Sequence, residues 1–337
     1  MKAIVSAAPG GPDTLRVAEL PEPAASRGEL LVRVEACAIN YPDALIIEDK
    51  YQFRPARPFA PGGEIAGTIE AVGEAVSGWK PGDRIIAATI SGGLAQRIVI
   101  PASSAFSLPG RHTAAEGAAL LMTYATGIHG LIDRGQLQAG ETLLVLGAAG
   151  GVGMAAIEIG KALGARVIAA VSSAEKAAAC RAIGADETLA YERGPFDTAG
   201  MKRLGDAFKA AAGPNGVDVV YDPVGGNYSE PALRTLNWGG RYLVIGFTAG
   251  IPAIPLNLPL LKGCDIRGVF WGGFVTRMPE RNRAHVAQLF QWWADGKLAP
   301  KIDRVFPFDD AGDAIAWVSG RHATGKVVVA VDPSGTA

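Results

Sequence analysis

The chain has 337 residues, of which 49% are hydrophobic and 19% are charged, and its formal net charge is −1. This length is sufficient for two domains with separate cores, and the composition is that of a globular protein rather than a disordered one. The near-neutral charge, without any block of basic residues, excludes strong electrostatic attraction to nucleic acid or to an anionic membrane.

The N-terminus and the cysteines indicate a cytoplasmic protein. Residues 2–5 already form a strand-like pattern, and no hydrophobic region of a signal peptide precedes them. Two long apolar stretches, 114–132 and 142–157, are interrupted by polar residues or clustered glycines, so neither predicts a membrane span. The three cysteines are far apart and odd in number, which favours a reducing compartment over a disulfide framework.

The first third of the chain has the pattern of a β-rich domain. Apolar runs at 30–34, 67–72 and 85–90 are short, and prolines and glycines separate them. Many short strands without intervening helices predict a compact β domain over residues 1 to about 110.

After residue 142 the pattern changes to an alternation of strands and helices. Strands are expected at 142–146, 166–171, 187–190, 217–221, 241–245 and 265–269. Helices are expected between them at 152–163, 174–183, 200–212 and 228–236. This alternation predicts an α/β fold with a doubly wound parallel sheet, whose ligand crevice lies outside the carboxyl ends of the strands. The remaining segment is expected to add helices at 288–295 and 311–318 and a strand at 326–331.

A glycine-rich stretch follows the first of these strands. The apolar run 143–146 precedes Gly150, Gly151 and Gly153, and an apolar helical pattern begins at 154. In a strand, turn and helix of this kind, backbone amides approach a pyrophosphate at the positive end of the helix. Ala148 replaces the first glycine of the Gly-x-Gly-x-x-Gly motif, so this stretch alone leaves open an ordinary glycine-rich turn. The residues expected to bind the cofactor here are Ala149, Gly150, Gly151, Val152 and Gly153.

The end of the next strand predicts which dinucleotide is bound. An NAD enzyme usually has Asp or Glu at this point, which binds the ribose 2′-hydroxyl. This chain instead has Ser172 and Ser173, and Lys176 follows one turn later. Hydroxyl groups and a cation suit a 2′-phosphate, so NADPH is favoured over NADH. The alternative is a serine that only caps the helix and a lysine that is only solvated.

These motifs also carry a family resemblance. The stretch 148–153, Lys176, and Gly184-Ala185-Asp186 before a short strand ending at Tyr191 resemble the zinc-free quinone oxidoreductases of the medium-chain dehydrogenase/reductase superfamily. The resemblance extends over nearly the whole chain. It implies a GroES-like catalytic domain at 1–122, completed by 266–337, and a Rossmann dinucleotide-binding domain at 123–265. It also implies a homodimer or a homotetramer.

The same resemblance implies that no metal is bound. Zinc-dependent members of the superfamily have a cysteine at the position of Asn40 and a histidine at that of Gly63, and their four-cysteine lobe has no counterpart after Ile90. Tetrahedral zinc needs clustered thiolate or imidazole ligands, and the spacing in this chain provides none. Without a Lewis acid to stabilise an alkoxide, the expected substrates are acceptors polarised by conjugation: quinones, enones and enoyl thioesters.

Three polar residues match positions that line the substrate cleft in the family, namely Asn40, Tyr41 and Tyr51. The Asn40 amide is expected to donate a hydrogen bond to the substrate carbonyl. The Tyr51 hydroxyl is expected to bind that carbonyl or to donate a proton to the oxyanion that hydride transfer produces. The alternative for Tyr51 is a ring that only packs on the surface loop.

The resemblance implies further cofactor contacts. Thr126 is expected beside the nicotinamide ribose, although Gly127 replaces the more usual alanine. Tyr191 and Arg321 are expected to face the 2′-phosphate, the alternative for Arg321 being a solvated turn residue. The segments that pass the nicotinamide contain Gly246, Phe247, Phe270 and Trp271. For the aromatic residues in them, the alternative is a place in the core.

The resulting prediction is NADPH-dependent, zinc-independent reduction of quinones or related α,β-unsaturated carbonyls by hydride transfer. The first alternative is an enoyl-thioester reductase on the same scaffold, which calls for an additional basic rim around the cleft. The directions of Arg54 and Arg57, which would decide this, are open. The second alternative is a protein that binds NADPH or RNA without catalysis, and the near-zero net charge gives it little support.

Overall fold

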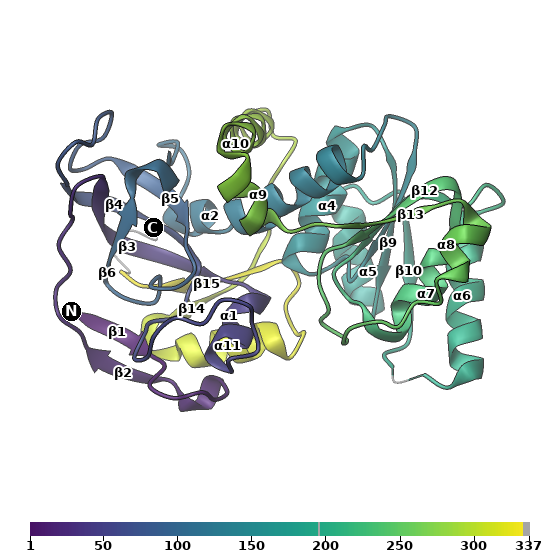
Figure 1. Cartoon of the computed structure of the whole chain (residues 1–337), viewed down its shortest axis with the longest axis horizontal. Coiled ribbons are helices and arrows are strands. Elements are labelled where there is room, and N and C mark those ends of the chain that lie inside the picture. Colours follow the sequence, from purple (N-terminus) through teal and green to yellow (C-terminus); the bar gives the residue numbers. More distant parts are fainter. Residues whose placement is uncertain (195, 333–337) are drawn as a thin grey trace. The chain divides into compact units, whose positions relative to one another are not determined.

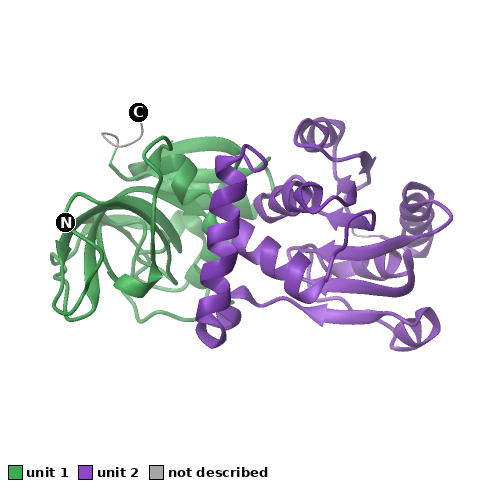
Figure 2. Ribbon diagram, turned by 90° about the horizontal axis from the view of Figure 1, so that it is seen from above, with its two compact units in different colours: residues 1–122, 300–337 green, residues 123–299 purple. Residues whose placement is uncertain are grey.

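Contacts between residues divide the chain into two units in a computed structural model, which describes residues 1–194 and 196–332. Unit 1 comprises Met1–Met122 together with the described residues from Pro300 onward, and unit 2 comprises Thr123–Ala299 (Figure 2). The chain therefore leaves unit 1 once and returns to it once.

The return lies further along the chain than 266, the residue that the sequence led us to expect. Strand β13 (Asp265–Gly268) pairs with β12 (Leu236–Val244) in the sheet of unit 2. Helices α9 (Trp271–Arg277) and α10 (Pro279–Ala294) belong to the same unit. Strand pairing and helix packing over these residues thus extend unit 2 to Ala299.

Unit 1 is built on a seven-stranded sheet in the order β14-β15-β3-β4-β5-β7, and β6 also pairs with β3. Its strands are β3 (Glu29–Ile39), β4 (Glu64–Val72), β5 (Arg84–Ala88), β6 (Arg97–Pro101), β7 (Ala105–Ser107), β14 (Ile302–Pro307) and β15 (Lys326–Ala330). A separate antiparallel pair consists of β1 (Lys2–Val5) and β2 (Arg16–Glu19). Leu30, Val32 and Val34 alternate along β3 and are fully buried, as one face of a strand requires. The β-rich N-terminal region is therefore confirmed.

Unit 1 also contains an α-helix that the sequence did not predict in its first hundred residues. Helix α1 (Tyr41–Ile47) begins where the backbone N–H of Asn40 donates to the Asp43 carboxylate at 2.7 Å, and Pro42 lies in its first turn. Seven residues are too few for a clear helical period, which is why the pattern was missed. Helices α2 (Ala114–Ala118) and α11 (Ala311–Ser319) complete the unit, and α11 packs against α1.

Unit 2 contains a six-stranded, entirely parallel sheet in the order β10-β9-β8-β11-β12-β13. The strands not yet defined are β8 (Thr142–Leu146), β9 (Arg166–Val171), β10 (Glu187–Ala190) and β11 (Val217–Asp222). All six predicted strands are present, although β12 begins at Leu236 rather than 241. This is the doubly wound order of a dinucleotide-binding sheet, as predicted.

Helices cover both faces of this sheet, with α4 on one face and α6 and α7 on the other (Figure 1). The helices are α3 (Thr126–Ile128), α4 (Gly151–Ala162), α5 (Ala174–Ala182), α6 (Thr198–Ala212), α7 (Ser229–Leu233) and α8 (Asn257–Lys262), followed by α9 and α10. Two π-helical segments, Leu121–Ala125 and His129–Arg134, flank α3. Helix α10 begins at Pro279 rather than 288, with the proline in its first turn. Over the described part of the chain, none of the helices has the length and hydropathy of a membrane span.

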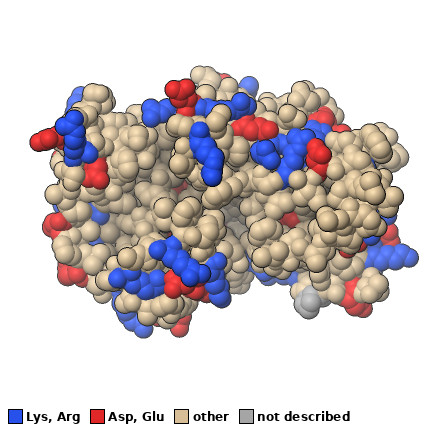
Figure 3. Space-filling model, viewed as in Figure 1, with Lys and Arg blue, Asp and Glu red and all other residues tan. Residues whose placement is uncertain are grey.

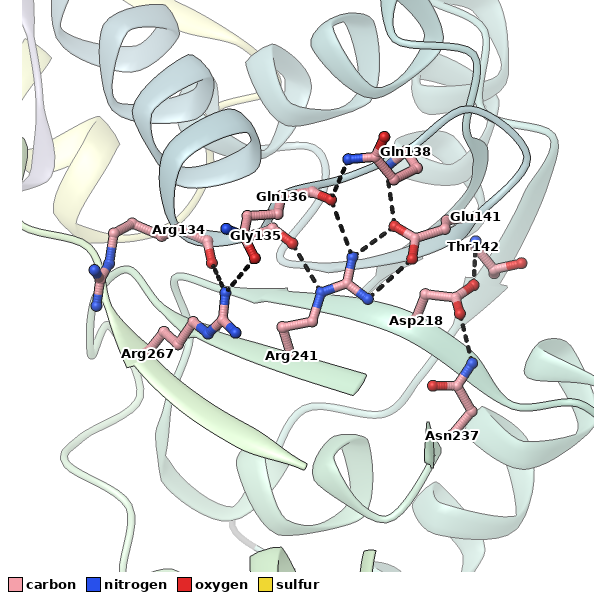
Figure 4. A network of polar contacts seen from close by, with 10 residues as sticks. All are labelled: Arg134, Gly135, Gln136, Gln138, Glu141, Thr142, Asp218, Asn237, Arg241 and Arg267. Carbon is pink, nitrogen blue, oxygen red and sulfur yellow. Dashed lines mark hydrogen bonds and ion pairs between the residues drawn. The ribbon is translucent and has the colours of Figure 1, made fainter. Parts of the chain in front are cut away.

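A polar network holds the amino-terminal side of the sheet (Figure 4). The Arg241 guanidinium binds the Glu141 carboxylate through two hydrogen bonds of 2.6 and 3.0 Å and donates to the carbonyl of Gly135 at 2.8 Å. Asp218 accepts the backbone N–H of Thr142 at 2.7 Å and the side-chain amide of Asn237 at 2.5 Å. The hydrogen bonds and the ion pair of this network stabilise the beginnings of the strands. The network therefore lies at the edge of the sheet opposite to the carboxyl edge, where the sequence places the cofactor.

Candidate functional site

The predicted cofactor residues of unit 2 gather at the carboxyl edge of its parallel sheet. β8 stands where the strand order reverses, because β9 and β11 flank it. In open parallel sheets ligands bind in the crevice at this switch point. The carboxyl edge of unit 2 is therefore the candidate cofactor site.

The turn after β8 is shaped by glycines. Gly147 has a φ of +54°, and Gly150 is the N-cap of α4, so no side chain caps this helix. A Cβ at Gly153 would lie 2.6 Å from the carbonyl oxygen of Gly147, and only glycine permits this close approach. The amides of the first helical turn, which includes Gly151 and Val152, therefore face an uncapped space that suits a pyrophosphate.

The end of β9 carries the residues predicted to select the cofactor. Ser173 is the N-cap of α5, and its hydroxyl accepts the backbone N–H of Lys176 at 3.2 Å. The capping role that the sequence left open is therefore present. Ser172, Ser173 and Lys176 are all half-buried at this corner of the sheet. Two hydroxyls, a lysine and the N-terminus of α5 form a donor set that fits a phosphate.

Tyr191 lies beside this corner, because its backbone N–H donates to the carbonyl of Val171 at the end of β9 at 2.8 Å. Its ring is tilted against that of Tyr228, with centroids 5.1 Å apart, and lies edge-on to that of Phe208 at 6.2 Å. The ring therefore belongs to the margin of the core. A contact between Tyr191 and a 2′-phosphate stays a prediction.

The two aromatic segments predicted beside the nicotinamide follow β12 and β13 at the same edge. Gly246 and Phe247 come directly after β12, and Phe270 and Trp271 come after β13. The phenyl rings of Phe247 and Phe270 are exposed, which argues against a core role for them. The indole N–H of Trp271 donates to Asn282 of α10 at 2.9 Å, so this side chain is anchored within unit 2.

Thr126 begins helix α3, which packs against α4. A Cβ at the neighbouring Gly127 would lie 2.8 Å from the side-chain end of Ile159 in α4. Glycine at this position therefore brings Thr126 close to the helix that follows the glycine turn. A contact between Thr126 and the nicotinamide ribose stays a prediction.

Asp222 supports the same edge, and the sequence analysis did not single it out. One carboxylate oxygen accepts the backbone N–H groups of Val224 and Gly225 at 2.7 and 2.9 Å. The other accepts the hydroxyl of Ser229 at 2.7 Å and the hydroxyl of Tyr242. These four bonds fix the loop after β11, which touches Gly147 through Val224. A carboxylate at the end of an apolar strand is the signal that would have identified it.

Unit 1 contains a buried polar cluster formed by Asn40, Asp43, Glu64 and Lys326. The Lys326 ammonium donates to Asn40 Oδ1 at 2.6 Å and to Glu64 Oε2 at 2.8 Å. Asn40 Nδ2 donates to the same Glu64 oxygen at 3.0 Å, and Glu64 Oε1 accepts the backbone N–H of Met122 at 2.8 Å. Glu64 is fully buried and Lys326 is only 3% exposed, so this ion pair is shielded from water.

The cluster fixes the orientation of the Asn40 amide. Its oxygen faces the Lys326 ammonium, and its nitrogen faces Glu64 and, at 3.4 Å, the carbonyl of Ala38. The residue is 7% exposed. Donation from Asn40 to a substrate carbonyl, which the sequence led us to expect, therefore requires exchange of one of these hydrogen bonds.

Asp43 gives unit 1 a titratable group in the physiological range. Burial raises the pKa of its carboxyl from 3.8 to about 6, against the stabilising hydrogen bond from the Asn40 backbone and the nearby Lys326 charge. Between these two values the folded protein binds a proton that the unfolded chain does not. Stability that is present below pH 3.8 is therefore lost as the pH rises through 6.

We expect Asp43→Asn to remove this dependence. Relative to the variant, the wild-type protein should lose about 2 kcal/mol of unfolding free energy between pH 4 and pH 7. Urea denaturation at both pH values measures the difference, and the exposed Asp13→Asn serves as the control. A difference between wild type and Asp43→Asn that stays constant with pH would contradict the assignment.

The other predicted residues of unit 1 lie on its surface segments. Tyr51 is half-buried, and its ring centroid lies 6.0 Å from that of Phe53. Burial raises the pKa of the Tyr51 hydroxyl, with Asp43 adding to the effect, so the group keeps its proton at neutral pH. Tyr41 opens α1 and is half-buried, and Arg321 lies exposed in the turn after α11.

Two arginines were candidates for a basic rim. The Arg57 guanidinium donates to the carbonyl of Ile47 at 2.7 Å, so it is held against its own unit. Arg54 is exposed. Only Arg54 is therefore presented to solvent as such a rim would require.

The residues around Asn40 do not fit a zinc ion. Within residues 1–194 and 196–332, no three His, Cys, Asp or Glu side chains form a group that could hold a metal. The Lys326 ammonium lies between Asn40 and Glu64, and its positive charge repels a divalent cation at this place. The polar groups at this place are therefore an ion pair, formed by Lys326 and Glu64, and the Asn40 amide that binds both of them.

Comparison with known proteins gives two family models and several close relatives. Residues 26–110 match the alcohol dehydrogenase GroES-like domain, and residues 151–291 match the family described as zinc-binding dehydrogenase. The "quinone oxidoreductase-like protein 2" of Bos taurus is 36% identical over 306 residues, which cover 90% of this chain and 85% of that protein.

Two solved structures are similar along their whole length. A mycobacterial protein complexed with NADPH is 30% identical with a TM-score of 0.90, over 98% of this chain and 100% of that chain. The Escherichia coli quinone oxidoreductase complexed with NADPH is 27% identical with a TM-score of 0.89, over the same shares of the two chains.

Proposed function

Because the chain belongs to the zinc-free quinone oxidoreductase branch of the medium-chain dehydrogenase/reductase superfamily, we propose that it uses NADPH to reduce quinones or related α,β-unsaturated carbonyls. The observation that carries the proposal is the carboxyl edge of unit 2. There an uncapped glycine turn follows β8, and two serines and a lysine follow β9. Solved relatives that carry NADPH add support.

In this proposal unit 2 binds the cofactor. The amides of Ala149 to Gly153 hold the pyrophosphate, and Ser172, Ser173 and Lys176 hold the 2′-phosphate. Asp222 keeps the loop after β11 in place beside them. Phe247 and Phe270 offer exposed rings that exclude water next to the nicotinamide. When bound, NADPH supplies the hydride.

Unit 1 then orients the substrate and moves the proton. The Tyr51 hydroxyl, which keeps its proton at neutral pH, donates it or a hydrogen bond to the substrate oxygen. Tyr41 is a second polar contact. Asn40 contributes through the orientation that Lys326 and Glu64 impose on it.

Parallel assays of NADPH oxidation test the substrate class and the independence from zinc. We expect phenanthrenequinone to be turned over faster than crotonyl-CoA, with no loss of activity after treatment with a chelator. The placement of Arg57 against its own unit favours the quinone. Faster turnover of crotonyl-CoA would move the protein to the enoyl-thioester reductases, and loss of activity with the chelator would overturn the zinc-free mechanism.

Tyr51→Phe is expected to lower kcat about 100-fold, since it removes the only proton that the side chain offers to the substrate oxygen. The affinity for NADPH should not change. The ring and its contact with Phe53 are retained, so an unchanged melting temperature serves as the control. Unchanged turnover at saturating quinone would remove Tyr51 from the mechanism.

We also propose that the protein is a homodimer, which in turn can form a homotetramer. The support is an apolar patch formed by Trp238, Leu256, Leu260 and Leu261, which are 82%, 80%, 79% and 71% exposed. Few charged side chains lie over α8 and β12 in Figure 3, where this patch is located. Edge strand β13 lies next to β12, and among the described strands none pairs with its outer side. In a two-fold symmetric dimer, the edge strand and the apolar patch of one copy would be covered by the same edge strand and patch of the second copy.

Leu260→Glu is expected to weaken dimerisation by about 100-fold or more, because each interface receives two buried charges. Light scattering after size exclusion should show a monomer with an unchanged melting profile at low concentration. Val17→Glu on β2, at a side chain that is 48% exposed, is the matched control and should remain dimeric. A variant as dimeric as the wild type would place the interface elsewhere.

We finally propose a cytoplasmic location. The three cysteines are buried and form no disulfides, and burial raises the pKa of Cys37 and of Cys264. Thiols of this kind are unreactive, and a chain without disulfides suits a reducing compartment.

A further inference from the structure

Glu158 is a buried carboxylate in the middle of α4, the helix that follows the glycine turn. It is 6% exposed, and both of its oxygens accept hydrogen bonds. Oε2 accepts the hydroxyl of Tyr124, which is itself 2% exposed, and Oε1 accepts the backbone N–H of Ala299 at 3.1 Å.

The two hydrogen-bond partners of Glu158 lie at the beginning and at the end of unit 2. Tyr124 is the second residue of unit 2, and Ala299 is its last. The chain enters unit 2 beside the first partner and leaves it beside the second. One carboxylate on the cofactor-binding helix therefore holds both connections to unit 1.

The entry segment also carries a predicted cofactor residue. Thr126 follows Tyr124 by two positions, and Gly127 approaches Ile159, the neighbour of Glu158 in α4. The hydrogen bond from Tyr124 and the close contact at Gly127 thus fix Thr126 against α4 from both sides. Because residues 121–125 are π-helical, their backbone leaves the regular α-helical bonding pattern at this point.

Keeping a carboxylate here is costly. Burial raises the pKa of Glu158, whereas the donors from Tyr124 and Ala299 favour its charged form. An apolar residue of similar size would pack without that cost. Buried polar groups can be retained because they select one arrangement of the chain over others. Here the two hydrogen bonds to Glu158 select one placement of the segments that carry Tyr124 and Ala299.

We propose that Glu158 is a positioning residue for the NADPH site, which ties both connections between the units to the helix that follows the glycine turn. It keeps Thr126 in place for the nicotinamide ribose. It also links binding of the cofactor to the two connecting segments, on which any movement between the units depends. The proposal rests on the proposed binding of NADPH for its functional part. Its structural part, the tie to Ala299 and Tyr124, is independent of that.

Three single variants separate the contacts. Glu158→Met keeps the length of the side chain and removes both acceptors, so the hydroxyl of Tyr124 and the N–H of Ala299 lose their partner. A glutamine would not do this, because its oxygen can accept from Ala299 while its nitrogen donates to the Tyr124 hydroxyl. Tyr124→Phe removes only the hydroxyl contact. Glu230→Met is the matched control, since Glu230 pairs on the surface of α7 with Arg234 at 2.6 Å.

Hydrogen exchange of the full chain and NADPH titration are the measurements. In Glu158→Met we expect amide exchange around Ala299 to accelerate about tenfold, and the Kd and KM for NADPH to rise about tenfold with the quinone KM unchanged. Tyr124→Phe should raise the NADPH constants by a smaller factor without faster exchange at Ala299. Glu230→Met should stay within twofold of the wild type in every measurement.

Two results would overturn the proposal. If exchange around Ala299 is the same in Glu158→Met and Glu230→Met, the carboxylate does not hold the exit connection. If exchange accelerates but NADPH binding is unchanged, Glu158 is structural only and has no positioning role. A wild-type protein that fails to bind NADPH at all would instead contradict the proposed function, and the exchange result would still decide the structural part.

Discussion

Replacing Lys326 by methionine is expected to lower the free energy of unfolding by about 3–5 kcal/mol. The ammonium group is buried in unit 1, where it donates to Glu64 at 2.8 Å and to Asn40 at 2.6 Å. Methionine has a similar length but offers no donor and no charge. The Glu64 carboxylate, which is fully buried, would then lack the opposite charge that compensates it.

Two further variants test this explanation by urea denaturation. Lys301→Met changes an exposed lysine beside β15, the strand that Lys326 begins. Its effect on the free energy of unfolding should stay within about 0.5 kcal/mol. Glu64→Gln combined with Lys326→Met removes both charges, and we expect the pair to recover most of the loss. Equal losses in Lys326→Met and Lys301→Met, or additive losses in the double variant, would contradict a buried ion pair.

The dependence of this cluster on distant contacts explains why the sequence did not predict it. Lys326 and Glu64 are 262 positions apart and meet only because β15 and β4 both pair with β3. A lysine at the start of an apolar strand is a visible signal, but the pattern does not say which carboxylate it meets. The sequence predicted Asn40 as a site residue, and the pairing of strands determined where its amide points.

Unit 2 was predictable because its signals are local. The apolar run at 143–146, the glycines after it and the helix that follows are contiguous, and the structure has β8 and α4 in these places. Alternating strands and helices leave few possible sheet orders, so the carboxyl edge could be placed as well. The end of the unit could not, because the sequence pattern does not show that α9 and α10, which follow β13, remain in it.

Within the candidate site, the residues found from the sequence are those whose role follows from backbone geometry. Gly153 is needed by the turn itself, and Ser173 caps a helix. Asp222 and Glu158 were missed as functional residues because each binds groups from a different part of unit 2. A single charged residue within an apolar segment marked both, and future sequence analysis should treat such residues as candidates for long-range support of a site.

Lys176→Ala is expected to raise the Kd for NADPH about 10- to 100-fold and to leave the Kd for NADH within about twofold. Lys176 lies at the third position of α5, half-buried beside Ser172 and Ser173 at the end of β9. A charge-assisted hydrogen bond to a phosphate contributes about 1.5–3 kcal/mol, and each 1.4 kcal/mol is a factor of ten in affinity. NADH carries a hydroxyl where NADPH carries the phosphate, so it does not make this contact.

Titration of both cofactors by fluorescence measures the two constants, with Lys209→Ala on the exposed side of α6 as the control. Lys176 is a cleaner test than Ser173, because removal of the Ser173 hydroxyl also removes the N-cap of α5 and lowers stability by about 1 kcal/mol. Equal losses for NADPH and NADH would mean that Lys176 supports the fold of the corner rather than the phosphate. A selective loss would instead show that this corner distinguishes the two cofactors by charge, since the neighbouring serines donate to a hydroxyl and to a phosphate alike.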